Sequence, residues 1–196
     1  MSNYILPGKQ QGAALAVSLI ILTLMTVIGV TAVKSSVIEN RIATNMHDKQ
    51  MSFEAAEAAL RDAEAWLIEQ ESSPGTSREK GATSTVTVWV KGVPTNTYSG
   101  VEATEEMMKF SDDSIWETYG ENYGDANGLS IAERMPGLSA APQFIVEQFT
   151  FIPDDLSAET LAAGRGEFYY RITARARGGS STSETLLQTI FRMRYN

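Results

Sequence analysis

The sequence contains no cysteine, which excludes disulfide bonds, thiolate metal ligands and a cysteine nucleophile. Histidine occurs once, at His47, so neither a Ser-His-Asp triad with an evident pocket nor a several-histidine metal site is indicated. Basic residues number 16 against 24 acidic ones, a formal net charge of −8, which disfavours a protein that binds nucleic-acid phosphates. The composition therefore predicts no cofactor, no metal and no nucleic-acid partner.

A calcium loop is suggested and then rejected at residues 121–130, ENYGDANGLS. The first and twelfth positions of the EF-hand pattern are occupied by Tyr123 and Arg134, so an Asn-Gly turn is favoured. A looser site of oxygen ligands stays open, formed by Asp112, Asp113, Glu121 and Asp125. Glycine patterns for phosphate or dinucleotide binding are missing as well, and we interpret the protein as not an enzyme.

Charge is absent between Lys9 and Lys34, and residues 13–33 are dominated by Leu, Ile, Val and Ala. As a helix this segment spans roughly 30 Å, the thickness of the bilayer hydrocarbon. A secretory signal has a shorter apolar core and a clear cleavage site, and a buried core helix is the other alternative. The segment favours a retained membrane helix.

The helical pattern continues past Lys34 to Glu71 without proline or glycine, and SSPG at 72–75 ends it. Apolar residues recur at steps of three and four, which predicts one long helix over 13–71, amphipathic in its second half. The residues of this predicted packing seam are Ile42, Met46, Phe53, Ala56, Leu60, Ala63 and Leu67.

Three β-rich runs lie near the C-terminus, at 143–152, 167–178 and 184–194. A fourth strand is predicted at 85–90, and short helices near 102–109 and 156–163. We expect an α+β fold in which the long helix packs on an antiparallel sheet of three to four strands. The C-terminal third has a basic bias, which predicts one solvated sheet face, with contact to an acidic neighbouring subunit as the alternative. The residues concerned are Arg165, Arg171, Arg175, Arg177, Arg192 and Arg194.

A short leader that ends at Gly12, an apolar helix and an amphipathic continuation resemble the type IV pilin-like proteins. The resemblance is narrower with the PilX family of minor pilins, through SFEAAEAALRDAE within residues 8–65. It extends to FYYRITARARGG and LLQTIFR within residues 143–194. Residues 72–142 are not covered by it.

The resemblance implies that a prepilin peptidase cuts after Gly12 and methylates the new amino terminus at Ala13. It divides the chain into a leader (1–12), a transmembrane and filament-core helix (13–33), an amphipathic continuation (34–71) and a globular head (72–196). The implied location is the bacterial inner membrane, as a single-pass protein with the head in the periplasm, and then the tip of the extracellular pilus. Positive-inside counting does not support this orientation, which rests on the resemblance.

The implied function is a minor pilin that helps to initiate type IV pilus assembly and forms part of the tip complex. Implied partners are other minor pilins, the major pilin, a large tip adhesin, the prepilin peptidase and, before assembly, inner-membrane lipid. Twitching motility, cell adhesion and DNA uptake all stay open as purposes of such a pilus.

Position 17 departs from the pilin pattern, because most pilins carry Phe first and Glu fifth after cleavage, where this chain has Ala13 and Val17. In the family that glutamate is taken to neutralise the amino terminus of the subunit ahead. A buried carboxylate without a partner is costly. Val17 therefore suits a subunit with none ahead of it, at the tip.

Two other interpretations stay open. A minor pseudopilin of a type II secretion system shares the helix but usually carries a bigger head. A single-pass, membrane-tethered periplasmic binding domain would not polymerise, and it would retain residues 1–12.

Overall fold

The computed structural model describes residues 11–79, 86–95, 109–124 and 135–195. Helix α1, Gln11–Ile68, begins the described chain. The contacts divide the chain into two units, of which the first ends at Met46 and the second begins at His47. Within the described residues the first unit is therefore a helix. The second unit, His47–Asn196, is called the head below.

Helix α1 is a single helix of 58 residues, in agreement with the helix that the sequence predicts over 13–71. Proline is absent from it, and Gly29 lies in its interior with no atom within 4 Å of the position that a Cβ would take. At the C-terminal end of α1 the chain forms a turn tighter than that of an α-helix, in which the Gln70 backbone N–H donates to the Leu67 carbonyl at 3.3 Å. Pro74 follows and prevents continuation of the helix.

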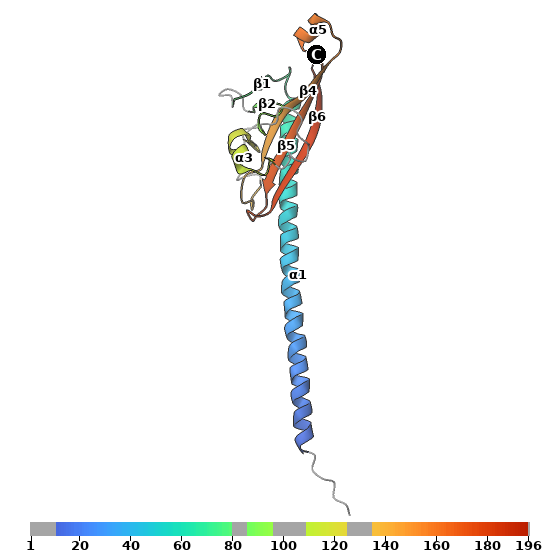
Figure 1. Cartoon of the computed structure of the whole chain (residues 1–196), viewed down its shortest axis with the longest axis vertical. Helices are drawn as coiled ribbons and strands as arrows, with labels where there is room; N and C mark the ends of the chain where they lie inside the picture. Colours follow the sequence, from blue (N-terminus) through green and yellow to red (C-terminus); the bar gives the residue numbers. More distant parts are fainter. Residues whose placement is uncertain (1–10, 80–85, 96–108, 125–134, 196) are drawn as a thin grey trace, which may run out of the picture. The chain divides into compact units, whose positions relative to one another are not determined.

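Six strands form the sheet of the head within the described residues. They are β1 Thr76–Ser77, β2 Val88–Val90, β3 Glu121–Asn122, β4 Gln143–Pro153, β5 Gly166–Arg177 and β6 Glu184–Tyr195. The strand order is β1-β2-β4-β5-β6, and β3 pairs with the beginning of β4. Strands β4, β5 and β6 are antiparallel neighbours, and β6 is the outermost of them (Figure 1).

The predicted α+β fold is confirmed, with one correction to the sheet. The strand predicted at 85–90 is observed as β2, but it runs parallel to β4 rather than antiparallel. The physical reason is the connection at 91–142, which is far longer than a hairpin and allows the chain to return in the same direction. Two short pairings, β1 with β2 and β3 with β4, were not predicted.

Two short helices complete the described head, α3 Asp113–Tyr119 and α5 Ala158–Ala163. The helical turn predicted at 156–163 is confirmed as α5, which Ser157 caps at its start and Gly164 ends with φ of 64°. The helix predicted near 102–109 falls almost wholly outside the described residues.

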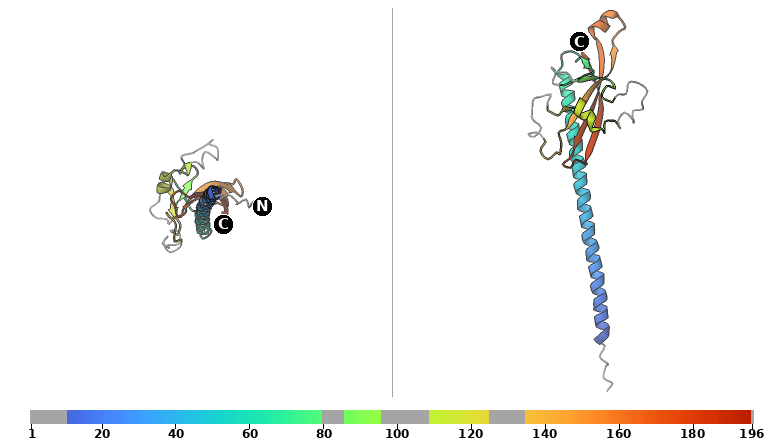
Figure 2. Two further views of the ribbon diagram at one scale, coloured as in Figure 1. Left: turned by 90° about the horizontal axis from the view of Figure 1, so that it is seen from below. Right: turned by 60° about the vertical axis from the view of Figure 1, so that its left-hand side comes forward.

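The head has three layers, with α1 on one face of the sheet and α3 on the other (Figure 2). On the α1 side, small residues of the helix pack against large residues of the sheet, such as Ala59 and Ala63 with Tyr170 and Ile172. On the α3 side the core contains Trp89, Phe110, Trp116 and Ile145. Both faces of the central strand β5 are therefore covered at its C-terminal half, which explains why its residues 170–176 are all buried.

Candidate assembly surfaces of the helix and the head

Within the first unit, every residue of α1 from 13 to 46 is exposed. An 18-residue window of the helix has a mean hydropathy of 2.6, and none of it is buried in the protein. By length and composition, α1 is therefore able to cross a membrane. So much apolar side-chain surface requires lipid or other helices to cover it.

The hydroxyl groups of the apolar part of α1 are all satisfied within the helix. Ser18, Thr23, Thr26 and Thr31 each donate a hydrogen bond to a backbone carbonyl three or four residues earlier, at 2.7–3.0 Å. Polar side chains bonded in this way do not oppose burial in lipid or in a bundle of helices.

The residues predicted to matter in maturation lie in the first turns of α1. Gly12 is inside the helix, and the side chains of Ala13 and Val17 are exposed. Ala13 and Val17 stand four residues apart and so lie on the same side of the helix. Cleavage after Gly12, methylation at Ala13 and the role of Val17 all stay predictions.

The predicted packing seam is only partly the face that α1 buries. Ala56, Ala63 and Leu67 are buried, and Leu60 is half-buried. Phe53 is 45% exposed, which corrects its predicted place in the packing with the head. Ile42 and Met46, in the first unit, are 53% and 68% exposed.

The face of α1 that is buried lies beside the predicted seam and overlaps it only in part. Its residues are mostly smaller than those of the seam. Ser52, Ala55 and Ala59 are buried, together with Asp62. Short side chains let the helix axis approach the sheet closely, so packing selects the alanine stripe rather than the stripe that contains Phe53. The spacing of apolar residues cannot distinguish two such neighbouring stripes on one helix.

The sequence predicted that the arginines of β5 lie on a solvated face of the sheet. The structure corrects this, because Arg171 and Arg175 are buried. Arg171 is buried and bonds the buried Glu147, with Nη2 2.8 Å and Nε 2.9 Å from Glu147 Oε2. The other carboxylate oxygen, Oε1, accepts from the Gly92 backbone N–H at 2.9 Å. Arg171 therefore binds an acidic group of its own chain and does not require one from a neighbouring subunit.

Arg175, four residues beyond Arg171 along β5, is held by α3. Its guanidinium bonds Asp113 and stands 4.9 Å from the centre of the Trp116 ring. The hydrogen bond from Arg175, together with the charge of Arg177, holds the pKa of Asp113 below its usual value. Asp113 is thus occupied by ion pairs, while Asp112 accepts from the Ser114 N–H as the cap of α3.

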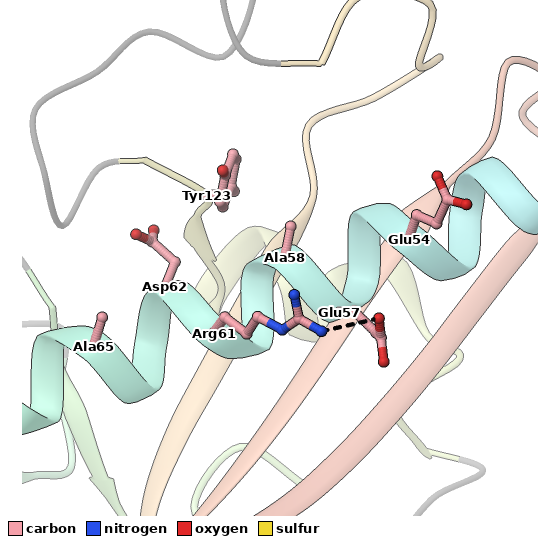
Figure 3. A pocket seen from close by; sticks show the side chains of 7 residues that line it. All are labelled: Glu54, Glu57, Ala58, Arg61, Asp62, Ala65 and Tyr123. Carbon is pink, nitrogen blue, oxygen red and sulfur yellow. Dashed lines mark hydrogen bonds and ion pairs between the residues drawn. The ribbon is translucent and has the colours of Figure 1, made fainter.

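A shallow hollow of about 480 Å³ lies between α1 and Tyr123, and Figure 3 shows its lining. Arg61 bonds Glu57 at 3.5 Å there, with both side chains well exposed. Asp62 accepts from the Gly124 backbone N–H at 2.8 Å. This arrangement is a solvated helix face with one ion pair, and it has no nucleophile beside a base.

A metal site would require several His, Asp or Glu side chains close together in the part of the chain that the structure describes. No group of three or more His, Asp or Glu side chains able to hold a metal ion occurs there. His47 is exposed on α1. Asp125, a member of the looser oxygen site considered from the sequence, lies outside the described residues.

Comparison with protein families gives two matches. A family model described as PilX N-terminal matches residues 11–61, and one described as type IV pilus assembly protein PilX C-term matches residues 73–193. Together they cover α1 as far as residue 61 and the head from residue 73 to residue 193. No curated protein and no solved structure matches the chain.

Proposed function

This chain belongs to the PilX family of type IV pilus assembly proteins, and we propose on that basis that it is a minor pilin. In this role it helps to initiate the pilus and forms part of the complex at the tip. The observation that carries the proposal is the match of both parts of the chain to one family, combined with an apolar α1 that the protein leaves uncovered.

The mechanism proposed for α1 is an exchange of surroundings. Before assembly its apolar residues contact inner-membrane lipid, and afterwards they contact the helices of neighbouring subunits. Helices associate in lipid where small residues allow their backbones to approach. The small residues available in α1 are Ala13, Ala14, Ala16, Ser18 and Gly29.

Maturation precedes this exchange in the proposal. A prepilin peptidase removes residues 1–12 and methylates Ala13, and the head then lies in the periplasm until assembly carries it outside the cell. The protein itself makes and breaks no bond. Its proposed partners are the other minor pilins, the major pilin and a large tip adhesin.

The first test is the intact mass of the protein from cells with and without the prepilin peptidase. We expect the mature chain to begin at methylated Ala13 only when the peptidase is present. Gly12→Val should block this processing, whereas Gly8→Val, the same change within the leader, should leave it intact. A chain that retains Met1 in the presence of the peptidase would contradict the proposal and favour a membrane-tethered domain that does not polymerise.

A further inference from the structure

Helix α1 carries an apolar stripe past the end of the segment that is long enough to cross a membrane. Residues 13–33 are sufficient to fill the hydrocarbon of a bilayer, and Lys34 follows them. Ile38 and Ile42 lie roughly 8 Å and 14 Å beyond that segment along the helix, and they face the same side. Their side chains are 56% and 53% exposed. Because lipid hydrocarbon does not reach them, these two residues require a protein surface to cover them.

This apolar stripe belongs to a heptad repeat whose register is fixed by Ile38 and Ile42. In a parallel pair of helices wound round each other, the first and fourth residues of each heptad, called a and d, face the partner. Isoleucine at a together with leucine at d is typical of two-stranded pairs. The residues that we call the heptad stripe of α1 are all exposed, and they are Ile21, Ile28, Ser35 and Ile42 at a, and Leu24, Thr31 and Ile38 at d.

Two charged residues lie on opposite flanks of the heptad stripe. Lys34 directly precedes the a position of Ser35, and Glu39 directly follows the d position of Ile38. Five residues of a helix correspond to a rotation of about 140°, so the side chains of Lys34 and Glu39 point away from each other. Glu39 accepts from the Ser35 hydroxyl at 3.1 Å, and neither charge has an ion-pair partner within the described residues of the chain. Both charges are therefore available to a second helix.

A second copy of the same helix supplies an opposite charge to each of these two residues. In a parallel pair, the residue before an a position lies beside the residue five places later on the partner helix. Lys34 of one copy then meets Glu39 of the second copy, and the two-fold axis repeats this ion pair on the other side. Copies inserted into one membrane with one orientation are necessarily parallel, so membrane insertion and the charges favour the same arrangement.

We propose that two copies of the chain pair in parallel through the heptad stripe in the membrane, before either copy enters a pilus. The inference rests on the proposed function, because it takes α1 to cross the inner membrane in one orientation in every copy. A two-fold pair of this kind is closed, since both copies use the same surface. It cannot extend into a filament, so the two copies must separate before assembly. The pair is therefore a resting form that covers the heptad stripe until the helices of the pilus replace the partner.

Lipid and the helix of a different subunit are poorer occupants of the heptad stripe. Lipid hydrocarbon covers the part of the stripe up to residue 33, but it does not reach Ile38 and Ile42. A different helix matches the flanks only when it has an acidic residue beside Lys34 and a basic residue beside Glu39 at the same spacing. A second copy meets this requirement by symmetry, and the charges therefore favour a second copy.

Single cysteines test the pairing directly, because the full-length chain has no cysteine of its own. Ile38→Cys places a thiol in the heptad stripe, whereas Asn40→Cys places one about 200° away, on the opposite side of α1. In membranes from pilus-producing cells, mild oxidation should convert the Ile38→Cys protein into a disulfide-linked dimer. We expect about tenfold less dimer from Asn40→Cys, since two cysteines form a disulfide only when their Cα atoms approach within about 7 Å.

Charge reversal distinguishes a specific pair from the brief collisions that a disulfide also traps. In the Ile38→Cys protein, Lys34→Glu and Glu39→Lys each place like charges side by side, and we expect each to lower the yield of dimer about fivefold. The double exchange of Lys34→Glu with Glu39→Lys forms both ion pairs again with the signs reversed, and it should restore the yield. A yield of dimer that is the same in all of these variants overturns the inference.

The outcomes separate this inference from the proposed function. Mass spectrometry identifies the partner in the cross-linked product, and we expect a second copy of the chain. A monomer, or an adduct of Ile38→Cys with a different subunit, overturns the inference, and the proposed function stands if the chain is still processed after Gly12 and present in pili. An unprocessed chain that is absent from pili overturns the proposed function, whereas the dimer of Ile38→Cys requires only the membrane orientation and still decides the pairing.

Discussion

Gly178, in the turn between β5 and β6, lies directly against Asp48 of α1. A Cβ added at Gly178 would stand 2.5 Å from the Asp48 backbone oxygen and equally close to Oδ1. The next residues of the turn continue the contact, since Ser180 Oγ donates to Asp48 Oδ2 at 2.5 Å. The hairpin end and the helix are thus joined where α1 enters the head.

Gly178→Ala should destabilise the head by about 1–3 kcal/mol, because the added methyl group meets backbone that must shift to make room. The control is Gly75→Ala, at a glycine with no atom within 4 Å of the new Cβ. Denaturant unfolding of the full-length chain in detergent, followed by tryptophan fluorescence, measures both. Equal stability of the two variants would contradict the close contact.

The Asp48 contact also predicts a dependence of stability on pH. Hydrogen bonds from the Ser180 side chain, and then from the backbone N–H groups of Ser180 and Gly179, lower the pKa of Asp48 below its usual 3.8. A carboxyl group with a lowered folded pKa stabilises the protein above its unfolded pKa. That contribution is lost as the pH falls through the folded value. Asp48→Asn should therefore flatten the decline of Tm below about pH 4.

The matched variant for this pH effect is Ser180→Ala, which removes the largest cause of the lowered pKa. We expect it to flatten the same acid decline, and the double variant to add little to either single change. Thermal melts at a series of pH values supply the measurement. Additive effects of the two substitutions would show that the carboxyl and the hydroxyl act separately.

The buried pair of Glu147 and Arg171 predicts an asymmetry between single and double substitutions. Arg171→Met leaves a buried carboxylate without its cation and should cost about 3–5 kcal/mol. Replacing both residues with apolar ones, as Glu147→Leu with Arg171→Met, should recover much of that loss. Denaturant midpoints of the three proteins decide this, and a double variant less stable than Arg171→Met would argue against the pair.

The apolar residue at position 17 leads to a prediction about the effect of a charge at that position in the assembled pilus. If the subunit has no pilin ahead of it, Val17→Glu places a carboxylate among apolar helices without a partner, at a cost on the order of several kcal/mol. We expect incorporation into pili to stay the same or fall, whereas Val17→Leu, the apolar control, should have no effect. Quantitative immunoblots of sheared pili measure this. A clear gain of the Glu variant in the pilus shaft would contradict a tip position.

The local features of this fold could be predicted from the sequence because they depend on neighbouring residues. The extent of α1 follows from the lack of proline over 13–71, and the strands β5 and β6 follow from their β-branched and aromatic residues. The residues that carry the resemblance to the PilX family, at the helix and at these strands, are equally local. The places of Gly12, Ala13 and Val17 in the first turns of α1 required no tertiary information.

Only the tertiary structure decided which surfaces are covered. Helix α1 buries its alanines against the sheet and leaves Phe53 partly exposed, because small residues permit a closer approach of the helix to the sheet. The spacing of apolar residues alone does not reveal which face is buried. Long-range pairing gave Arg171 a buried carboxylate from a different strand, and among the described strands it left β6 paired with β5 alone. Hydropathy and spacing describe one element at a time, and these features depend on what a second element places beside the first.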